Sequence, residues 1–256
     1  MSSLKNKVTL VTGSSSGIGF GIAEHFASLG SSIVIHGLRE EESRAAADRL
    51  HGADVVVTFG DLRDPETCRQ IVRFAIQSKG GVDVLVNNAG DTSRGSLESA
   101  SLEFWDNMMA VNLRAPFLCL QEAVKSMKGR GGGSIINIGS INAYVGAPKL
   151  GPYSVSKGGL MTLTKNAALA LGPHKIRVNQ LNVGWTLTEG EDAVQRNVGH
   201  AGGWVDEAIA TRTFGRLLLP RDIAKAAAYF ACDDSELVTG SVLDIEQFPI
   251  GGFPDF

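Results

Sequence analysis

Short apolar, β-branched runs alternate along this chain with longer segments in which apolar residues recur at helical spacing. The runs occupy residues 8–11, 33–35, 55–59, 82–86, 134–138, 176–181 and 242–245. The segments between them, such as residues 18–29 and 160–171, have the spacing of helices packed on one face. Strands that are apolar on both faces and joined by helical crossovers are typical of a parallel sheet covered on both sides. The pattern therefore predicts an α/β protein with a doubly wound, Rossmann-type parallel sheet of about seven strands and helices on both faces.

The composition narrows the class of protein. The 256 residues are 43% hydrophobic and 20% charged and contain no Pro- or Ser-rich linker, which predicts one domain over residues 1–256. A net charge of −3 with scattered Lys and Arg argues against nucleic acid as a partner. We expect no membrane span and no leader, and hence no membrane partner and a cytoplasmic location. Cys68, Cys119 and Cys232 lie far apart with no His at ligand spacing, so we expect buried thiols and no metal site.

A glycine-rich turn follows the first predicted strand and leads directly into a helix. Gly13 permits the tight turn, Gly17 lets the backbone approach a pyrophosphate, and Gly19 allows close packing of helix and strand. The start of the helix offers free N–H groups and a positive dipole end to phosphates. No Lys follows the last glycine, which argues against a mononucleotide kinase loop. The turn predicts a dinucleotide site, and the alternative is an ordinary glycine-rich turn.

Tyr153 and Lys157 lie four residues apart near the start of a predicted helix that ends at Leu171, which places both side chains on one face. Because an ammonium stabilises a nearby phenolate, we expect Lys157 to lower the pKa of Tyr153 and make it a general acid and base. Ser140 follows the run at residues 134–138, at the ligand edge of the sheet, where its hydroxyl can donate to a substrate oxygen. The alternative is an amphipathic Tyr, a solvated Lys and a capping Ser.

In their order along the chain, these motifs resemble the short-chain dehydrogenase/reductase family in its compact, single-domain form. The resemblance covers nearly the whole sequence: T-G-S-S-S-G-I-G at residues 12–19, Asp61-Leu62, N-N-A-G at residues 87–90, Asn112, Ser140 and Y-S-V-S-K at residues 153–157. Each motif alone is weak evidence, whereas six in register are specific.

The resemblance implies a role for each matching residue. Tyr153 would be the catalytic acid and base, Ser140 would orient and polarise the carbonyl, and Lys157 would also hold the nicotinamide ribose. Asn112, in the helix after Trp105, would hold through its backbone a water that links Lys157 to solvent. The residues expected in cofactor binding are Gly13, Ser15, Ser16, Gly17, Ile18, Gly19, Leu38, Arg39, Asp61, Leu62, Asn88, Ala89, Gly90, Tyr153, Lys157, Gly184, Thr186 and Thr188.

The stretch after residue 181 departs from the family pattern. The family usually has Asn-Pro-Gly there, whereas this chain has Asn-Val-Gly, and Gly184 with Thr186 and Thr188 can still form a clasp on the nicotinamide amide. Trp185 is expected to line the substrate pocket and to favour a ligand with an apolar face or a sugar-like ring. The expected substrate contacts are Ser140, Asn142, Tyr153 and Trp185. Residues 186–203 are polar and dotted with glycine, and we expect an irregular, mobile lid.

The C-terminal end is the second departure. Residues 247–256 carry many apolar side chains for a chain end, and such residues need cover. Because the family is commonly tetrameric, we expect a homotetramer in which this tail packs across a subunit interface.

The choice between NAD and NADP depends on the end of the second predicted strand. An NAD site usually carries Asp or Glu there, whereas this chain has Gly37, Leu38 and Arg39. Arg39 can pair with a 2′-phosphate. Against this, Ser16 stands where many phosphate-preferring relatives place a basic residue, and three Glu residues at 40–42 oppose an added anion. The balance favours NADP over NAD by a small margin.

The sequence thus predicts an NAD(P)-dependent oxidoreductase that interconverts a small-molecule secondary alcohol and a ketone by hydride transfer. The alternative is a non-catalytic dinucleotide-sensing or scaffold protein of the same fold, which predicts a damaged catalytic set, whereas here the set is whole. Polyols and sugars, hydroxy acids, 3-oxoacyl thioesters and cyclic ketones all remain open as substrates.

Overall fold

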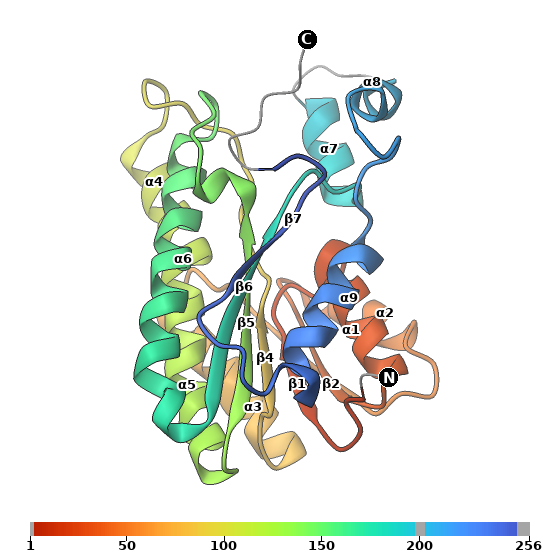
Figure 1. The fold of residues 1–256 in the computed structure, drawn as a ribbon, viewed down its shortest axis with the longest axis vertical. Helices are drawn as coiled ribbons and strands as arrows, with labels where there is room; N and C mark the ends of the chain where they lie inside the picture. The colour runs from red at the N-terminus through yellow and green to blue at the C-terminus, as the bar shows by residue number, and fades with distance from the viewer. Residues whose placement is uncertain (1–2, 198–202, 250–256) are drawn as a thin grey trace.

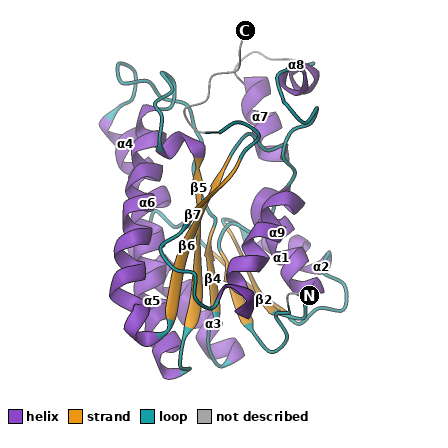
Figure 2. Cartoon of the chain, viewed as in Figure 1, coloured by secondary structure: helices purple, strands orange, loops and turns teal. Residues whose placement is uncertain are grey.

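The computed structural model describes residues 3–197 and 203–249 of the chain. In that part, seven parallel strands form one sheet in the order β3-β2-β1-β4-β5-β6-β7 (Figure 2). The strands are β1 (Val8–Val11), β2 (Ser32–Gly37), β3 (Val55–Phe59), β4 (Val84–Asn87), β5 (Gly133–Ser140), β6 (Ile176–Val183) and β7 (Val242–Ile245). The strand order reverses between β1 and β4, which is where ligands bind in open α/β sheets.

Helices cover both faces of this sheet (Figure 1). Those on one face are α1 (Gly17–Ser28), α2 (Glu40–Asp48) and α9 (Pro220–Ala231), and those on the other are α3 (Pro65–Lys79), α4 (Leu102–Met109), α5 (Ala115–Gly129) and α6 (Gly151–Leu171). A π-helical turn at Ala110–Arg114 joins α4 to α5. Two further helices, α7 (Glu189–Asn197) and α8 (Trp204–Ala210), lie beyond the carboxyl ends of the strands, at the top of Figure 1.

Each central strand supplies side chains to two hydrophobic cores. On β1, Val11 packs in the core under α1 and α9, whereas Leu10 packs in the core under α3 and α5. Ile33 and Val34 on β2 divide in the same way. This follows from the two-residue period of a strand, and it explains why the apolar runs of the sequence are continuous instead of alternating.

The predicted fold class is confirmed, and the differences lie at the ends of strands and in the stretch after β6. The strands expected at residues 134–138 and 176–181 continue to Ser140 and Val183, so Ser140 is the last residue of β5. The expectation of an irregular stretch at residues 186–203 is wrong over residues 189–197, which form α7. There the Thr188 hydroxyl accepts a hydrogen bond from the Glu191 N–H (3.1 Å), which satisfies a free donor in the first turn of the helix.

The expected C-terminal tail lies outside the described residues from residue 250 onward. Its beginning contacts the same chain: the Gln247 amide donates to the Arg216 carbonyl oxygen (2.6 Å), and the Arg212 guanidinium lies 4.9 Å from the centre of the Phe248 ring. Packing of the rest across a subunit interface stays a prediction.

Candidate active site

Two adjoining cavities lie at the carboxyl ends of the strands. The one beside β1, β2 and β3 has a volume of about 550 Å³, and the one beside β5 and β6 about 420 Å³. Both are lined by Ile18, Asn88, Gly90, Thr188 and Gly190. They therefore form two halves of one cleft, which crosses the reversal point of the strand order.

The turn between β1 and α1 forms the floor of the first half. Gly13 and Gly17 both have positive φ, at 63° and 55°, a region that L side chains rarely adopt. A Cβ atom at Gly13 would lie 2.8 Å from the Ala89 Cα. The start of α1, at Ser16, has no side-chain cap, so its first N–H groups are available to a ligand. An uncapped helix start beside a glycine turn fits the phosphates of a dinucleotide.

Polar contacts between neighbouring strands hold this turn in place. The Asn88 side-chain amide donates to the Thr12 and Gly13 carbonyl oxygens, both at 3.0 Å. The Thr12 hydroxyl accepts from the backbone N–H groups of Asn88 and Ala89, both at 3.0 Å. On the other side the Gly13 N–H donates to His36 Nδ1 (3.2 Å), and burial lowers the pKa of His36 to about 4. His36 is therefore neutral, which keeps Nδ1 free to accept.

The second half of the cleft brings together Ser140, Tyr153 and Lys157. The Ser140 hydroxyl oxygen accepts from the Asn142 N–H (3.2 Å) and from its side-chain amide (3.3 Å). The Ser140 hydroxyl also lies close enough to the Tyr153 phenol to act on its pKa. The structure thus places together the hydroxyl and the phenol that the sequence paired.

The pKa of Tyr153 differs from the sequence-based expectation. Burial raises the pKa of the phenol, and the nearby Ser140 hydroxyl and the Arg94 charge only partly oppose this rise. The Lys157 ammonium donates to the Ile138 carbonyl oxygen (2.9 Å) and lies 5.7 Å from the centre of the Tyr153 ring. Burial also lowers the pKa of Lys157 to about 8. The ammonium therefore bonds to the β5 backbone instead of the phenol, which explains why it does not lower the pKa of Tyr153 here.

Asn112 lies in the π-helical turn and is 1% exposed. Its side-chain oxygen accepts from the Asp91 N–H (2.7 Å), and its amide donates to the Asp91 carbonyl oxygen (2.9 Å) and the Ser156 hydroxyl (3.1 Å). Ser156 in turn donates to the Tyr153 carbonyl oxygen (2.7 Å). Asn112 thus joins the loop after β4 to the catalytic turn of α6, and the water expected on its backbone stays a prediction.

Most of the predicted contacts line the cleft. Trp185 and Asn142 line its second half, as do Gly184 and Thr186. The Trp185 ring also stacks on the Trp204 ring, at a centroid distance of 5.7 Å. The predicted cofactor residues that line either half are Gly13, Ser15, Ser16, Gly17, Ile18, Leu38, Asp61, Leu62, Asn88, Ala89, Gly90, Tyr153, Lys157, Gly184, Thr186 and Thr188.

Gly19 and Arg39 do not line the cleft. Gly19 packs inside the turn, where a Cβ would collide with the Gly13 carbonyl oxygen, so its contribution is to packing. Arg39 forms an ion pair with Glu42, with 69% of its side chain exposed. The charged pair that lines the first half of the cleft is instead Asp61 with Arg63 (2.5 Å), and Arg63 lowers the pKa of Asp61.

The polar residues in the second half of the cleft that the sequence reasoning missed include Arg94, Glu191 and Gln195. Arg94 comes from the loop after β4, and the other two lie one turn apart on α7. The four-residue spacing of Glu191 and Gln195 was a usable signal, but it required residues 189–197 to be recognised as a helix.

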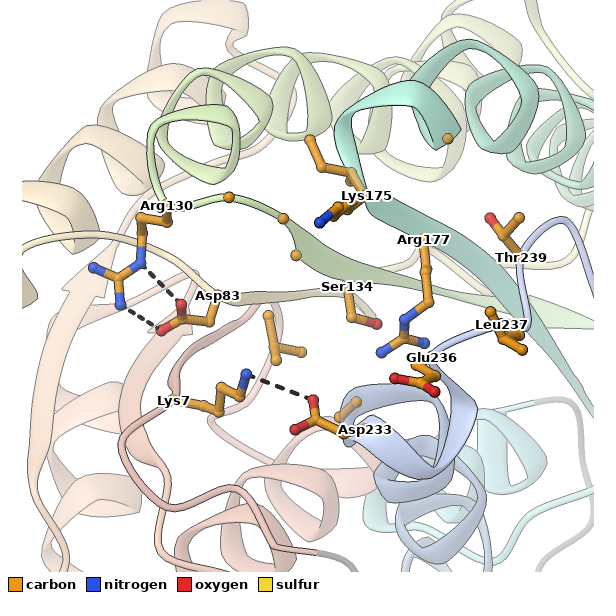
Figure 3. Close-up of a pocket in the computed structure, with 17 residues that line it drawn as sticks. Lys7, Asp83, Arg130, Ser134, Lys175, Arg177, Asp233, Glu236, Leu237 and Thr239 are labelled. Carbon is orange, nitrogen blue, oxygen red and sulfur yellow. Dashed lines mark hydrogen bonds and ion pairs between the residues drawn. The ribbon is translucent and has the colours of Figure 1, made fainter.

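A larger cavity, of about 700 Å³, lies at the opposite edge of the sheet (Figure 3). Its charged groups pair with one another: Arg130 with Asp83 (2.8 Å) and Lys7 with Asp233 (3.6 Å). Arg177 donates to backbone carbonyl oxygens beyond α9 and at its last turn. These contacts hold the amino ends of the strands to α9, and the cavity shares no residue with the cleft.

Two features are absent from the part of the chain that the structure describes. No helix there is long and apolar enough to cross a membrane. Residues 3–197 and 203–249 also contain no group of three or more His, Cys, Asp or Glu arranged to hold a metal ion.

Comparisons with known proteins agree with this geometry. Residues 13–247 match the family model described as enoyl-(acyl carrier protein) reductase. Dehydrogenase/reductase SDR family member 4 of Sus scrofa is 35% identical, with 94% of this chain and 86% of that protein covered. A solved structure of a 7α-hydroxysteroid dehydrogenase with NADH and 7-oxo glycochenodeoxycholic acid has a TM-score of 0.89 and 27% identity. The match covers 97% of this chain and 96% of that chain.

A further solved structure contains the phosphorylated cofactor. It is a proposed NAD(P)-dependent gluconate 5-dehydrogenase from Beutenbergia cavernae, with NADP bound at low occupancy. It has a TM-score of 0.87 and 30% identity, and the match covers 96% of this chain and 97% of that chain.

The fold, the cleft and these matches define an oxidoreductase that uses a nicotinamide dinucleotide. The chain belongs to the short-chain dehydrogenase/reductase family.

Proposed function

We propose that this protein interconverts a secondary alcohol and a ketone, with Tyr153 as the general acid and base. The observation that carries the proposal is that Ser140, Tyr153 and Lys157 line one cavity, which adjoins the half of the cleft that contains the glycine turn. A reacting carbon held beside the phenol would lie where a nicotinamide can reach it.

The roles of the side chains follow from their contacts. A bound nicotinamide dinucleotide supplies the acceptor or donor of the hydride. During ketone reduction, the phenol of Tyr153, which its raised pKa keeps protonated, gives its proton to the substrate oxygen, and Ser140 donates a hydrogen bond to that oxygen. During oxidation, the deprotonated phenol takes the proton of the substrate hydroxyl. Lys157 would hold the nicotinamide ribose.

The test is a screen of secondary alcohols and ketones with both dinucleotides, in which the absorbance of the reduced nicotinamide measures turnover. We expect turnover of at least one alcohol class that requires Tyr153. Dinucleotide binding without turnover on any panel, in the wild-type protein, would favour the non-catalytic sensor or scaffold instead.

We further propose that NADP is preferred over NAD, through Arg39. Its ion pair with Glu42 is solvent-exposed, and such pairs contribute little, about 0–1 kcal/mol, so Arg39 can turn to a 2′-phosphate at small cost. Replacement of Arg39 by Ala should then raise the KM for NADP several-fold and leave the KM for NAD unchanged. A wild-type preference for NAD above tenfold would contradict this assignment.

We also propose a homotetramer in which the C-terminal tail contributes to an interface. Removal of residues 253–256 should then lower the oligomer mass or raise the Michaelis constant. If both stay unchanged, the tail has no such role.

A further inference from the structure

The second half of the cleft has a charged wall opposite the catalytic phenol. Glu191 Oε1 accepts three hydrogen bonds: from the Gln195 amide (2.7 Å), the Trp185 indole N–H (2.9 Å) and the Arg94 guanidinium (3.4 Å). Arg94, Glu191 and Tyr153 line the same cavity. This wall therefore borders the space in which a substrate hydroxyl would react at Tyr153.

The Glu191 carboxylate is fixed through one of its two oxygens. Trp185 and Gln195 both donate to Oε1, and within residues 3–197 and 203–249 no partner is recorded for Oε2. The side chain of Glu191 is 15% exposed, and it lines the cavity. Oε2 is thus a fixed acceptor on the wall of a confined space.

The guanidinium of Arg94 also keeps free donors. Within the described chain it donates to Glu191 and to the Thr92 carbonyl oxygen (3.2 Å), which uses two of the five N–H groups of an arginine. Its contact with Glu191 is long, at 3.4 Å. The wall therefore presents donors and an acceptor side by side, with no net charge.

These groups discriminate between classes of substrate. An apolar alcohol would remove water from both charges without replacing its hydrogen bonds, which is unfavourable. A carboxylate would be attracted by Arg94 but repelled by Glu191, which Trp185 and Gln195 hold in place. A neutral hydroxyl group can donate to Glu191 and accept from Arg94, which preserves both charges and their pairing.

We propose that the substrate is a neutral polyol or sugar, and that its hydroxyl groups bridge Arg94 and Glu191 while another hydroxyl reacts at Tyr153. This inference rests on the proposed alcohol and ketone chemistry. It names Arg94 and Glu191 as specificity-determining residues, and it assigns Trp185 the task of holding the carboxylate.

The first test compares three kinds of alcohol with the wild-type protein and its preferred dinucleotide. The probes are neutral polyols and aldoses, sugar acids of the same chain length such as gluconate, and apolar cyclic alcohols such as cyclohexanol. We expect kcat/KM for the best neutral polyol or aldose to exceed that of its sugar acid, and that of cyclohexanol, by at least tenfold. A higher kcat/KM for the sugar acid or for cyclohexanol would overturn the inference.

The second test uses Glu191→Gln, which keeps the size of the side chain and removes its charge. A hydrogen bond to a charged acceptor is stronger than one to a neutral acceptor, by an amount that corresponds to roughly tenfold in binding. We expect KM for the polyol to rise about tenfold, kcat to change little, and the preference for the sugar acid to increase because Arg94 is released. The matched control is Glu207→Gln, on the exposed face of α8. We expect its kcat and KM to equal those of the wild-type protein.

Failure of this inference is distinguishable from failure of the proposed function. If no alcohol in any panel is oxidised, the proposed function fails. If an apolar alcohol or a sugar acid is oxidised in a Tyr153-dependent manner and neutral polyols are not, the chemistry holds and the substrate assignment fails. An unchanged KM for the polyol in Glu191→Gln would likewise contradict the bridging role.

Discussion

Two glycines of the turn after β1 differ in the space around them, although their backbones are alike. Gly13 and Gly17 have φ values of 63° and 55°, so an alanine at either position carries the same kind of strain. A Cβ at Gly13 would lie 2.8 Å from the Ala89 Cα, whereas a Cβ at Gly17 would meet the Thr188 side chain at 3.7 Å, an ordinary contact. Comparison of Gly13→Ala with Gly17→Ala therefore separates strain from crowding.

The expected magnitudes follow from these two causes. The left-handed region costs a residue with a Cβ roughly 1–2 kcal/mol, so the free energy of unfolding of both variants falls by this amount. Overpacking against a fixed backbone atom costs about 1–3 kcal/mol more, and only Gly13→Ala carries this term. For a chain of this size, each kcal/mol lowers the melting temperature by roughly 2–4 °C. Gly13→Ala should therefore melt about 5 °C below Gly17→Ala.

Thermal unfolding followed by circular dichroism, without dinucleotide, measures the difference. A parallel titration with dinucleotide should show weaker binding in Gly17→Ala than its small loss of stability explains, if the backbone at Gly17 meets the phosphates as we expect. Equal melting temperatures for the two variants would refute the argument that Ala89 is what requires a glycine at position 13.

Two further predictions concern the catalytic groups. The pKa of Lys157 is lowered to about 8 in the folded protein, so above pH 8 the unfolded chain binds more protons than the folded one. The free energy of unfolding of the wild-type protein should therefore rise relative to that of Lys157→Met, by up to roughly 3 kcal/mol between pH 8 and 10.5. Urea unfolding at a series of pH values tests this, and parallel curves for the two proteins would contradict it. Ser140→Ala removes the hydroxyl that we propose donates to the substrate oxygen, and it should lower kcat about 100-fold to 1,000-fold without weakening dinucleotide binding. A loss below tenfold in steady-state assays would exclude a direct role for the hydroxyl.

Local patterns were sufficient to predict the sheet and the cofactor half of the cleft. The apolar runs fix the strands because each strand is buried on both faces, and the β1 turn is encoded in adjacent residues that include Gly13 and Gly17. Ser140, Tyr153 and Lys157 were also predictable, since a strand end and one helical turn bring them to the same edge of the sheet.

The details that depend on contacts between distant segments were not predictable. The burial of Tyr153 and the burial of Lys157 set the two pKa directions, and neither is visible in a four-residue spacing. The pair of Arg94 and Glu191 joins residues 97 positions apart. Its recognition required α7, whose T-x-x-E start at Thr188 was present in the sequence but was read as part of a loop.

The central claim is that the phenol of Tyr153 transfers the substrate proton within a cleft that binds a nicotinamide dinucleotide. Its most direct test is Tyr153→Phe, assayed for turnover with the best alcohol of the screen and for dinucleotide affinity by titration. We expect turnover to fall by at least about 1,000-fold and the dissociation constant of the dinucleotide to stay within about threefold of the wild-type value, since phenylalanine preserves the ring. Turnover within tenfold of the wild-type rate would contradict the account.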